Sequence, residues 1–143
     1  QAAVKSDYTV AELNHNFELK KEQIIARLGD EDFAIWDARS EKEYTGEKEI
    51  SARGGHIPGA AHYDWMQAMD IRKQHALRSE SALLAELAER GITPDKHIVV
   101  YCQTHHRSAH TYAMLKQLGF SRVSGYPGAW SDWGNDAQTP VET

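Results

Sequence analysis

Apolar residues recur at helical spacing in three segments of the chain: residues 18–28, 81–90 and 106–118. The apolar positions of the first are Leu19, Ile24, Ile25 and Leu28, and those of the third are Ala109, Ala113, Met114 and Leu118. A glycine directly follows each segment, as is common at helix ends. We therefore predict three amphipathic helices, with shorter helices within residues 39–55 and from Gly128.

Short runs rich in β-branched and aromatic residues predict strands between these helices. They lie at residues 33–37, 97–101 and 121–125, with a further strand after the Pro-Gly turn in residues 56–63 and an extended piece at residues 9–13. The run at 97–101 is nearly continuously apolar, which is typical of a central parallel strand covered on both faces. Because helical and strand patterns alternate, we predict an α/β fold with a mainly parallel sheet.

A single cysteine, Cys102, lies between the strand at residues 97–101 and the helix at residues 106–118. Parallel α/β sheets bind their ligands at this end of the strands. A loop wound at a helix N-terminus turns backbone N–H groups inwards and binds anions. Such a position lowers the pKa of a thiol from about 8.5 to roughly 3.5–7.5, and Arg107 adds a positive charge. The pattern indicates a thiolate nucleophile beside an anion site. The alternative is an inert buried thiol.

Composition narrows the possible partners. The chain has 143 residues, which suits one domain, and its net charge of -5 argues against nucleic acid or an anionic membrane surface. No apolar run approaches the roughly 20 residues of a membrane span. One cysteine excludes an internal disulfide and a thiolate-rich metal site.

Residues 1–8 lack the apolar core of a signal peptide, so we expect a cytoplasmic protein. Because it starts at Gln1, we interpret the chain as a piece of a longer protein.

The length of the loop distinguishes two kinds of chemistry. Four residues separate Cys102 from Arg107, so the loop from cysteine to arginine has six members. Cysteine-dependent phosphatases use the spacing C-x5-R, which would place the arginine where Ser108 stands. We expect the shorter loop to hold a smaller group than phosphate, namely a sulfur atom attached to the cysteine. A phosphatase or an arsenate reductase on the same fold is the alternative enzyme.

Several sequence blocks resemble those of rhodanese domains, the sulfurtransferase fold. They lie at residues 37–46, 55–60, 101–108 and 128–133, and the tail at residues 139–142 is also similar. The resemblance is greatest to the catalytic C-terminal domain of bacterial tandem-domain thiosulfate:cyanide sulfurtransferases that carry a Cys-Gln-Thr-His-His-Arg loop. The order and spacing of the blocks cover most of the chain.

This resemblance implies a three-layer rhodanese-like α/β fold, with a central, mainly parallel five-stranded sheet flanked by helices. Residues 1–143 would form a single domain with a linker-like lead-in at residues 1–17, preceded in the full-length protein by another rhodanese domain. In the family the loop cysteine becomes a persulfide and the loop arginine binds substrate, roles that map onto Cys102 and Arg107. The implied reaction moves sulfur from thiosulfate, or a related donor, to cyanide or a thiol, with no cofactor except the covalent persulfide.

The other loop side chains and two nearby residues complete the predicted site. Substrate contacts are expected from Gln103, Thr104, His105, His106 and Ser108. We expect Asp37 and Arg39 to support the loop, the first by accepting loop N–H bonds and the second through a buried ion pair. Cys102, His106 and His110 are spaced by four. However, the cysteine lies in the loop and zinc would consume the nucleophile, so we predict no metal site.

The sequence also departs from the family pattern. Some tandem enzymes place a basic residue just after the cysteine and another arginine about where Glu43 stands. Gln103 follows the cysteine here, which weakens the case for thiosulfate as the physiological donor. Arg107 could instead pair with a structural carboxylate. The chain could also be half of a site whose activity needs a sister domain.

Overall fold

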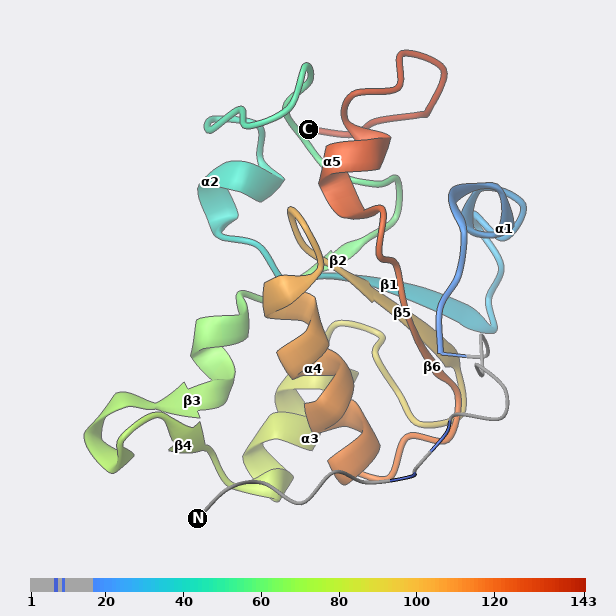
Figure 1. Ribbon diagram of the computed structural model, residues 1–143. Coiled ribbons are helices and arrows are strands. Elements are labelled where there is room, and N and C mark those ends of the chain that lie inside the picture. Colours follow the sequence, from blue (N-terminus) through green and yellow to red (C-terminus); the bar gives the residue numbers. More distant parts are fainter. Residues whose placement is uncertain (1–6, 8, 10–16) are drawn as a thin grey trace.

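The computed structural model describes residues 7, 9 and 17–143, and Figure 1 shows how their helices and strands are arranged. Apart from Thr9, the predicted extended piece at residues 9–13 lies outside the described residues, as does most of the predicted lead-in at residues 1–17. Within the described part of the chain, no helix is both long and apolar enough to cross a membrane.

The central sheet consists of parallel strands in the order β2-β1-β5-β6. Their bounds are Ala61–His62 for β2, Phe33–Asp37 for β1, His97–Tyr101 for β5 and Val123–Gly125 for β6. β5 pairs with both β1 and β6, the central position that its continuous apolar sequence predicts. A separate antiparallel pair is formed by β3 (Met69–Asp70) and β4 (Ala76–Leu77).

The described residues contribute four strands to this sheet, whereas we predicted five. Beyond β6 they add a single parallel bridge between Glu18 and Gly125. Leu19 N–H donates to Gly125 O at 2.9 Å, and Gly125 N–H donates to Phe17 O at 2.7 Å. The chain then enters a helix, so these bonds do not extend into a ladder. The predicted class, α/β with a mainly parallel sheet, is confirmed.

The strands are connected by α1 (Lys21–Ile25), α2 (Glu41–Tyr44), α3 (Glu80–Ala88), α4 (His106–Gln117) and α5 (Ala129–Trp133), and by the 3₁₀ helices η1 (Trp65–Ala68) and η2 (Ile71–Lys73). α1 is much shorter than the helix predicted over residues 18–28. It starts late because Leu19 N–H and Phe17 O bond with Gly125, and it ends early because residues 26–29 form turns, in which Arg27 N–H donates to Ile24 O. Ile24 is fully buried, but Ile25, predicted on the same face, is 40% exposed.

α4 buries only part of the face predicted: Met114 is buried and Leu118 packs against the core, as expected. Ala109 and Ala113 are exposed, and the buried residues of the helix are Ser108, Thr111, Met114 and Leu115. Thr111 satisfies its hydroxyl locally by donating to Ser108 O at 2.9 Å, so a small polar residue can face the sheet. The prediction was wrong for the two alanines, because it did not allow for buried hydroxyl groups that find hydrogen-bond partners.

Side chains of β5 alternate between two hydrophobic clusters on opposite faces of the sheet. The first contains Ile98 and Val100 with the helix residues Leu83, Leu87 and Met114. The second contains Val99 and Tyr101 with the helix residues Ile24, Trp130 and Trp133. Thus α3 and α4 cover one face, where Figure 1 shows them together, and α1 and α5 cover the other. This arrangement gives the predicted three layers.

Candidate active site

The loop between β5 and α4 carries Cys102 at the carboxyl end of the central strand, and Figure 1 shows it rising between α2 and α5. α5 fixes the backbone of this loop. Trp130 N–H donates to Cys102 O at 2.9 Å, and Ser131 N–H donates to Gln103 O at 3.0 Å. Because these two carbonyl groups bond with α5, the loop can direct N–H groups at the sulfur instead.

Cys102 is only 1% exposed, and the groups around its sulfur are hydrogen-bond donors of the protein. The donors are the Ser108 hydroxyl, the backbone N–H groups of Ser108 and Thr104, and the guanidinium of Arg107. Burial raises the pKa of the Cys102 thiol, but these hydrogen bonds and the charge of Arg107 outweigh burial and lower the pKa overall. A lower pKa increases the fraction of thiolate, the nucleophilic form. The environment favours a nucleophile over an inert thiol.

Arg107 is bound by a buried carboxylate from α2. Its Nη1 and Nη2 donate to the two carboxylate oxygens of Glu43 at 2.8 and 2.7 Å, a bidentate pair. Burial raises the pKa of Glu43, yet hydrogen bonds from Arg107 and Ser40 outweigh it and lower the pKa to about 2. The guanidinium therefore contacts both Glu43 and Cys102. Both alternatives considered for Arg107, a place at the site and pairing with a carboxylate, are present together.

His105 and Ser108 form a hydrogen bond beside the sulfur, with 2.7 Å between His105 Nδ1 and Ser108 Oγ. Ser108 is fully buried. His105 has a φ of 67°, in the left-handed region that non-glycine residues rarely adopt. Burial lowers the pKa of His105, and the neighbouring His106 lowers it further, so the ring is neutral at neutral pH. These two predicted contact residues are thus engaged with each other.

The remaining predicted contact residues differ in how they are placed. The side chains of Thr104 and His106 are exposed. Gln103 Nε2 donates to Ser51 Oγ at 3.1 Å, while Gln103 Oε1 is buried without a partner among the described residues. Leaving a buried acceptor unpaired costs about 1–3 kcal/mol, so the Gln103 amide is only partly satisfied within the described structure.

The spacing of Cys102, His106 and His110 does not produce a metal cluster. His110 packs edge-on against Trp65, with ring centroids 5.5 Å apart, and its Nδ1 is buried and unpaired within the described structure. Over residues 7, 9 and 17–143, no three His, Cys, Asp or Glu side chains are arranged to share a metal ion.

Asp37 and Arg39 form a buried ion pair behind the loop. Arg39 Nη2 donates to Asp37 Oδ2 and to Gly55 O, both at 2.6 Å, and Arg39 N–H donates to Asp37 Oδ1 at 3.0 Å. The hydroxyl of Tyr101, the last residue of β5, donates to Asp37 Oδ2 at 2.6 Å. The guanidinium carbon lies 4.5 Å from the ring centroid of Trp130. The pair therefore joins β1, β5, α5 and the segment at Gly55.

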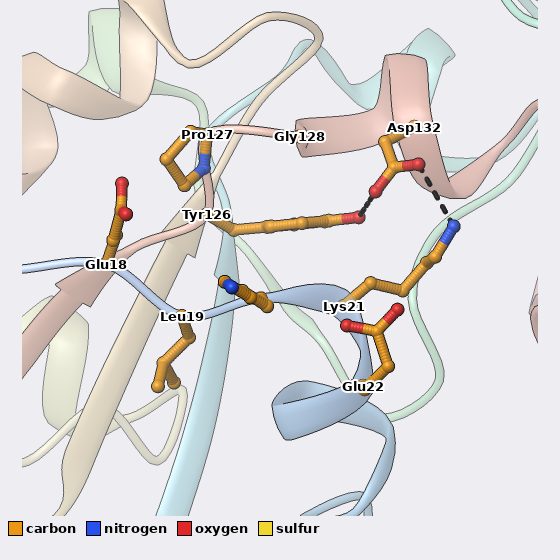
Figure 2. Close-up of a pocket in the computed structure, with 9 residues that line it drawn as sticks. Glu18, Leu19, Lys21, Glu22, Tyr126, Pro127, Gly128 and Asp132 are labelled. Atoms are coloured by element: carbon orange, nitrogen blue, oxygen red, sulfur yellow. Dashed lines mark hydrogen bonds and ion pairs between the residues drawn. The ribbon is translucent and has the colours of Figure 1, made fainter. Parts of the chain in front are cut away.

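A pocket of about 340 Å³ borders α5 but does not include the Cys102 loop (Figure 2). The start of α1 and the residues before it line this pocket, together with residues 126–128 and Asp132. Figure 2 shows the Tyr126 hydroxyl pointing at Asp132, 2.6 Å away, and Lys21 Nζ donating to the same carboxylate at 3.0 Å. Because these polar groups satisfy one another, we assign no sulfur chemistry to this pocket.

The family model of the rhodanese-like domain matches residues 20–136. The chain belongs to the rhodanese-like domain family. The thiosulfate sulfurtransferase of Azotobacter vinelandii is 54% identical over 122 residues, which cover 85% of this chain and 44% of that protein. The thiosulfate sulfurtransferase of Pseudomonas aeruginosa is 48% identical with the same coverage. The chain thus spans less than half the length of these relatives.

Solved structures extend the comparison. The anaerobic ergothioneine biosynthesis enzyme from Chlorobium limicola matches with a TM-score of 0.83 and 29% identity, over 90% of this chain and 32% of that one. A variant of EanB, solved with ergothioneine covalently linked to a cysteine persulfide, matches with a TM-score of 0.82 and 29% identity over the same shares. A cysteine persulfide therefore occurs in a protein with a similar domain.

Proposed function

We propose that this domain transfers a sulfane sulfur from thiosulfate, or a related donor, to cyanide or a thiol through a persulfide on Cys102. The observation that carries the proposal is the set of donors around the Cys102 sulfur, which lowers its pKa despite burial. The two thiosulfate sulfurtransferases at 54% and 48% identity support sulfur transfer over phosphate chemistry. The persulfide in the EanB variant supports the proposed intermediate.

In the first step, the Cys102 thiolate attacks the outer sulfur of thiosulfate. A bond forms between Cys102 Sγ and that sulfur, while the sulfur–sulfur bond of thiosulfate breaks and its electron pair leaves with sulfite. The N–H groups of Thr104 and Ser108 stabilise the anionic sulfur in the loop. Arg107 supplies positive charge for the departing sulfite. Sulfite leaves as an anion, so the step requires no proton donor.

In the second step, a thiophilic acceptor attacks the terminal sulfur of the persulfide. With cyanide, a carbon–sulfur bond forms and the sulfur–sulfur bond of the persulfide breaks. Thiocyanate leaves, and the electron pair of the broken bond stays on Cys102 Sγ, which becomes a thiolate again. The two half-reactions give ping-pong kinetics. The covalent persulfide is the carrier, and the proposal assigns no metal or organic cofactor. We place the reaction in the cytoplasm, whose reducing conditions keep a single thiol free.

Mass spectrometry of the purified chain tests the persulfide. Thiosulfate should add the mass of one sulfur atom to the protein, and cyanide should remove it and yield thiocyanate. Cys102→Ser, the matched control, should show neither change. A chain that keeps its unmodified mass in excess thiosulfate would contradict the proposal. Hydrolysis of an aryl phosphate that is lost in Cys102→Ser would support the phosphatase alternative instead.

A second candidate is a half-site that carries sulfur but needs a sister domain for turnover. The observation in its favour is coverage, since the chain spans 44% of each thiosulfate sulfurtransferase relative. In this version the full-length protein has an N-terminal rhodanese domain that lines one side of the cleft. Persulfide formation then proceeds in this chain, while delivery of the sulfur to an acceptor is slow.

A further inference from the structure

The Ser108 hydroxyl lies between two groups that can both accept its hydrogen. Ser108 Oγ is 2.7 Å from His105 Nδ1, and the same hydroxyl bonds to the Cys102 sulfur. A serine hydroxyl has one hydrogen to donate and two lone pairs to accept with. Ser108 is fully buried, so water cannot readily replace either partner. The direction of the His105–Ser108 bond therefore determines whether the sulfur receives the hydroxyl hydrogen.

A thiolate at Cys102 has no hydrogen of its own and can only accept. The Ser108 hydroxyl must then donate to the sulfur, and its oxygen must accept from His105. This requires the His105 tautomer with the hydrogen on Nδ1. In the opposite tautomer, His105 Nδ1 would accept the Ser108 hydrogen, and the sulfur would lose a donor.

The structure holds His105 firmly in this position. The residue keeps a φ of 67°, a strained conformation that persists only where surrounding contacts enforce it. Its ring covers the backbone of Gly125, where a Cβ would lie only 2.5 Å from His105 Nε2. Glycine at the end of β6 thus leaves the space that the imidazole occupies. Strand, strained loop residue and helix together aim Nδ1 at Ser108.

We propose that His105 is a positioning residue for the sulfur carrier: it donates from Nδ1 to Ser108 Oγ and so directs the Ser108 hydrogen onto the Cys102 sulfur. The same hydrogen bond is available to the Cys102 sulfur in the persulfide. The proposal deepens the sulfur-transfer function and rests on it. It also explains why a histidine that is neutral at neutral pH lies within hydrogen-bonding distance of a serine at this site.

Other charged groups act on the same centre and must be kept constant in a test. Arg107 faces the sulfur from α4, and Glu43 faces Arg107 from α2. His106 lies next to His105 in sequence, and Glu18 acts on His105 from the bridge beside β6. A useful substitution therefore changes the hydrogen-bonding role of residue 105 and leaves these four groups in place.

Asn and Asp at position 105 form a matched pair. Both are short, both tolerate a positive φ, and only the amide of Asn can donate to Ser108. The thiolate fraction is measured as the rate of alkylation of Cys102 by iodoacetamide across pH. His105→Asn should keep the pKa of Cys102 near that of the parent chain. His105→Asp should raise this pKa and slow alkylation at neutral pH by about tenfold, the effect of losing one hydrogen bond to a charged sulfur.

The negative charge of Asp also disfavours a thiolate. His105→Asn and His105→Asp are therefore each combined with Ser108→Ala, and alkylation is measured again. Without the hydroxyl, no hydrogen bond leads from residue 105 through Ser108 to the Cys102 sulfur. Any remaining difference in alkylation between Asn and Asp then reflects charge alone. The proposal requires that most of the difference disappears with Ser108→Ala. A difference that persists in full overturns it.

Nitrogen NMR of the unmutated chain provides a second measurement that does not depend on the stability of variants. At neutral pH, His105 should show a protonated Nδ1 and an unprotonated Nε2, and the reverse tautomer overturns the proposal. Neither readout requires turnover. If both tests give the expected result but the chain never gains sulfur, the role of His105 stands and the proposed function is wrong. If the chain gains sulfur but His105 has the reverse tautomer, the proposed function stands and the role of His105 is wrong.

Discussion

At the residue scale, Glu43 reduces the positive charge that Arg107 offers to an anionic substrate. It is 3% exposed, its pKa is lowered to about 2, and both of its oxygens accept hydrogen bonds from Arg107. The ion pair is therefore fully charged at neutral pH, and the carboxylate offsets much of the field of the guanidinium. Thiosulfate carries two negative charges, so we expect the site to bind it weakly.

Glu43→Gln should strengthen thiosulfate binding. The amide keeps the shape and one acceptor oxygen for Arg107 but removes the negative charge. The thiosulfate concentration that half-saturates persulfide loading should fall by about three- to tenfold, the usual range for relieving one like-charge contact at a partly buried site. Mass spectrometry at short reaction times measures the loading.

Glu41→Gln on the exposed side of α2 is the matched control, because it makes the same change in net charge away from Arg107. It should leave loading unchanged. Equal effects of the two substitutions would show that only the overall charge matters, and no effect of Glu43→Gln would mean that the pair does not restrict the donor.

The sequence was sufficient to place Cys102 and Arg107 together between a strand and a helix, because that signal is local. It could not identify Glu43 as the partner of Arg107, since the two lie 64 positions apart and meet only when α2 folds beside the loop. The bond between His105 and Ser108 was also missed, although only three positions separate them. A histidine in the left-handed conformation cannot be recognised from residue type alone.

At the element scale, the approach of β6 to the Cys102 loop is controlled by Gly125. Gly125→Ala requires no unusual backbone angle, but the added methyl group would collide with the His105 ring. We expect a loss of about 1–3 kcal/mol in the free energy of unfolding, together with slower alkylation of Cys102 at neutral pH. Urea denaturation and iodoacetamide kinetics measure the two effects.

Gly29→Ala separates general destabilisation from this contact. Gly29 has a φ of 86° and open space around it, so alanine there adds strain of roughly 1–2 kcal/mol without touching the loop. Alkylation of Cys102 should be unchanged in this control. If Gly125→Ala also left alkylation unchanged, His105 would not need the space at Gly125.

Helices and strands were predicted best where the burial of apolar side chains alone determines their position. β5 is apolar at nearly every position and lies at the centre of the sheet, as its sequence indicated. α1 begins later than predicted because Leu19 N–H and Phe17 O bond with Gly125 of β6, a contact between distant parts of the sequence. On α4 the hydrophobic pattern was only partly right, since Met114 is buried as predicted but Ser108 is buried and Ala109 is exposed.

At the scale of the whole molecule, the alternation of helix and strand patterns was enough to predict an α/β fold with a mainly parallel sheet, and the resemblance to rhodanese domains added the expectation of three layers. The sheet order was not predictable in the same way, because it depends on which strands pair across long stretches of chain. The net charge of -5 bears on function at this scale, since a negative molecule slows the approach of anionic donors.

The half-site candidate is tested by comparing this chain with a full-length tandem protein that contains it. Persulfide loading should be similar in both proteins, because the donors to the Cys102 sulfur all lie within this chain. If a sister domain completes the cleft, thiocyanate formation should be at least tenfold faster in the full-length protein. Equal rates would show that this domain is a complete catalyst.

The hydrogen bonds from Trp130 and Ser131 to the carbonyl groups of the Cys102 loop also have a consequence for protein synthesis. The ribosome makes the cysteine well before it makes α5, and domains fold as units when their elements have emerged. Until residues 130 and 131 have left the ribosome, the loop lacks the contacts that shape it. In a nascent or truncated chain that lacks α5 we therefore expect an ordinary thiol, and the proposed reactivity towards sulfur donors would be acquired only when α5 docks.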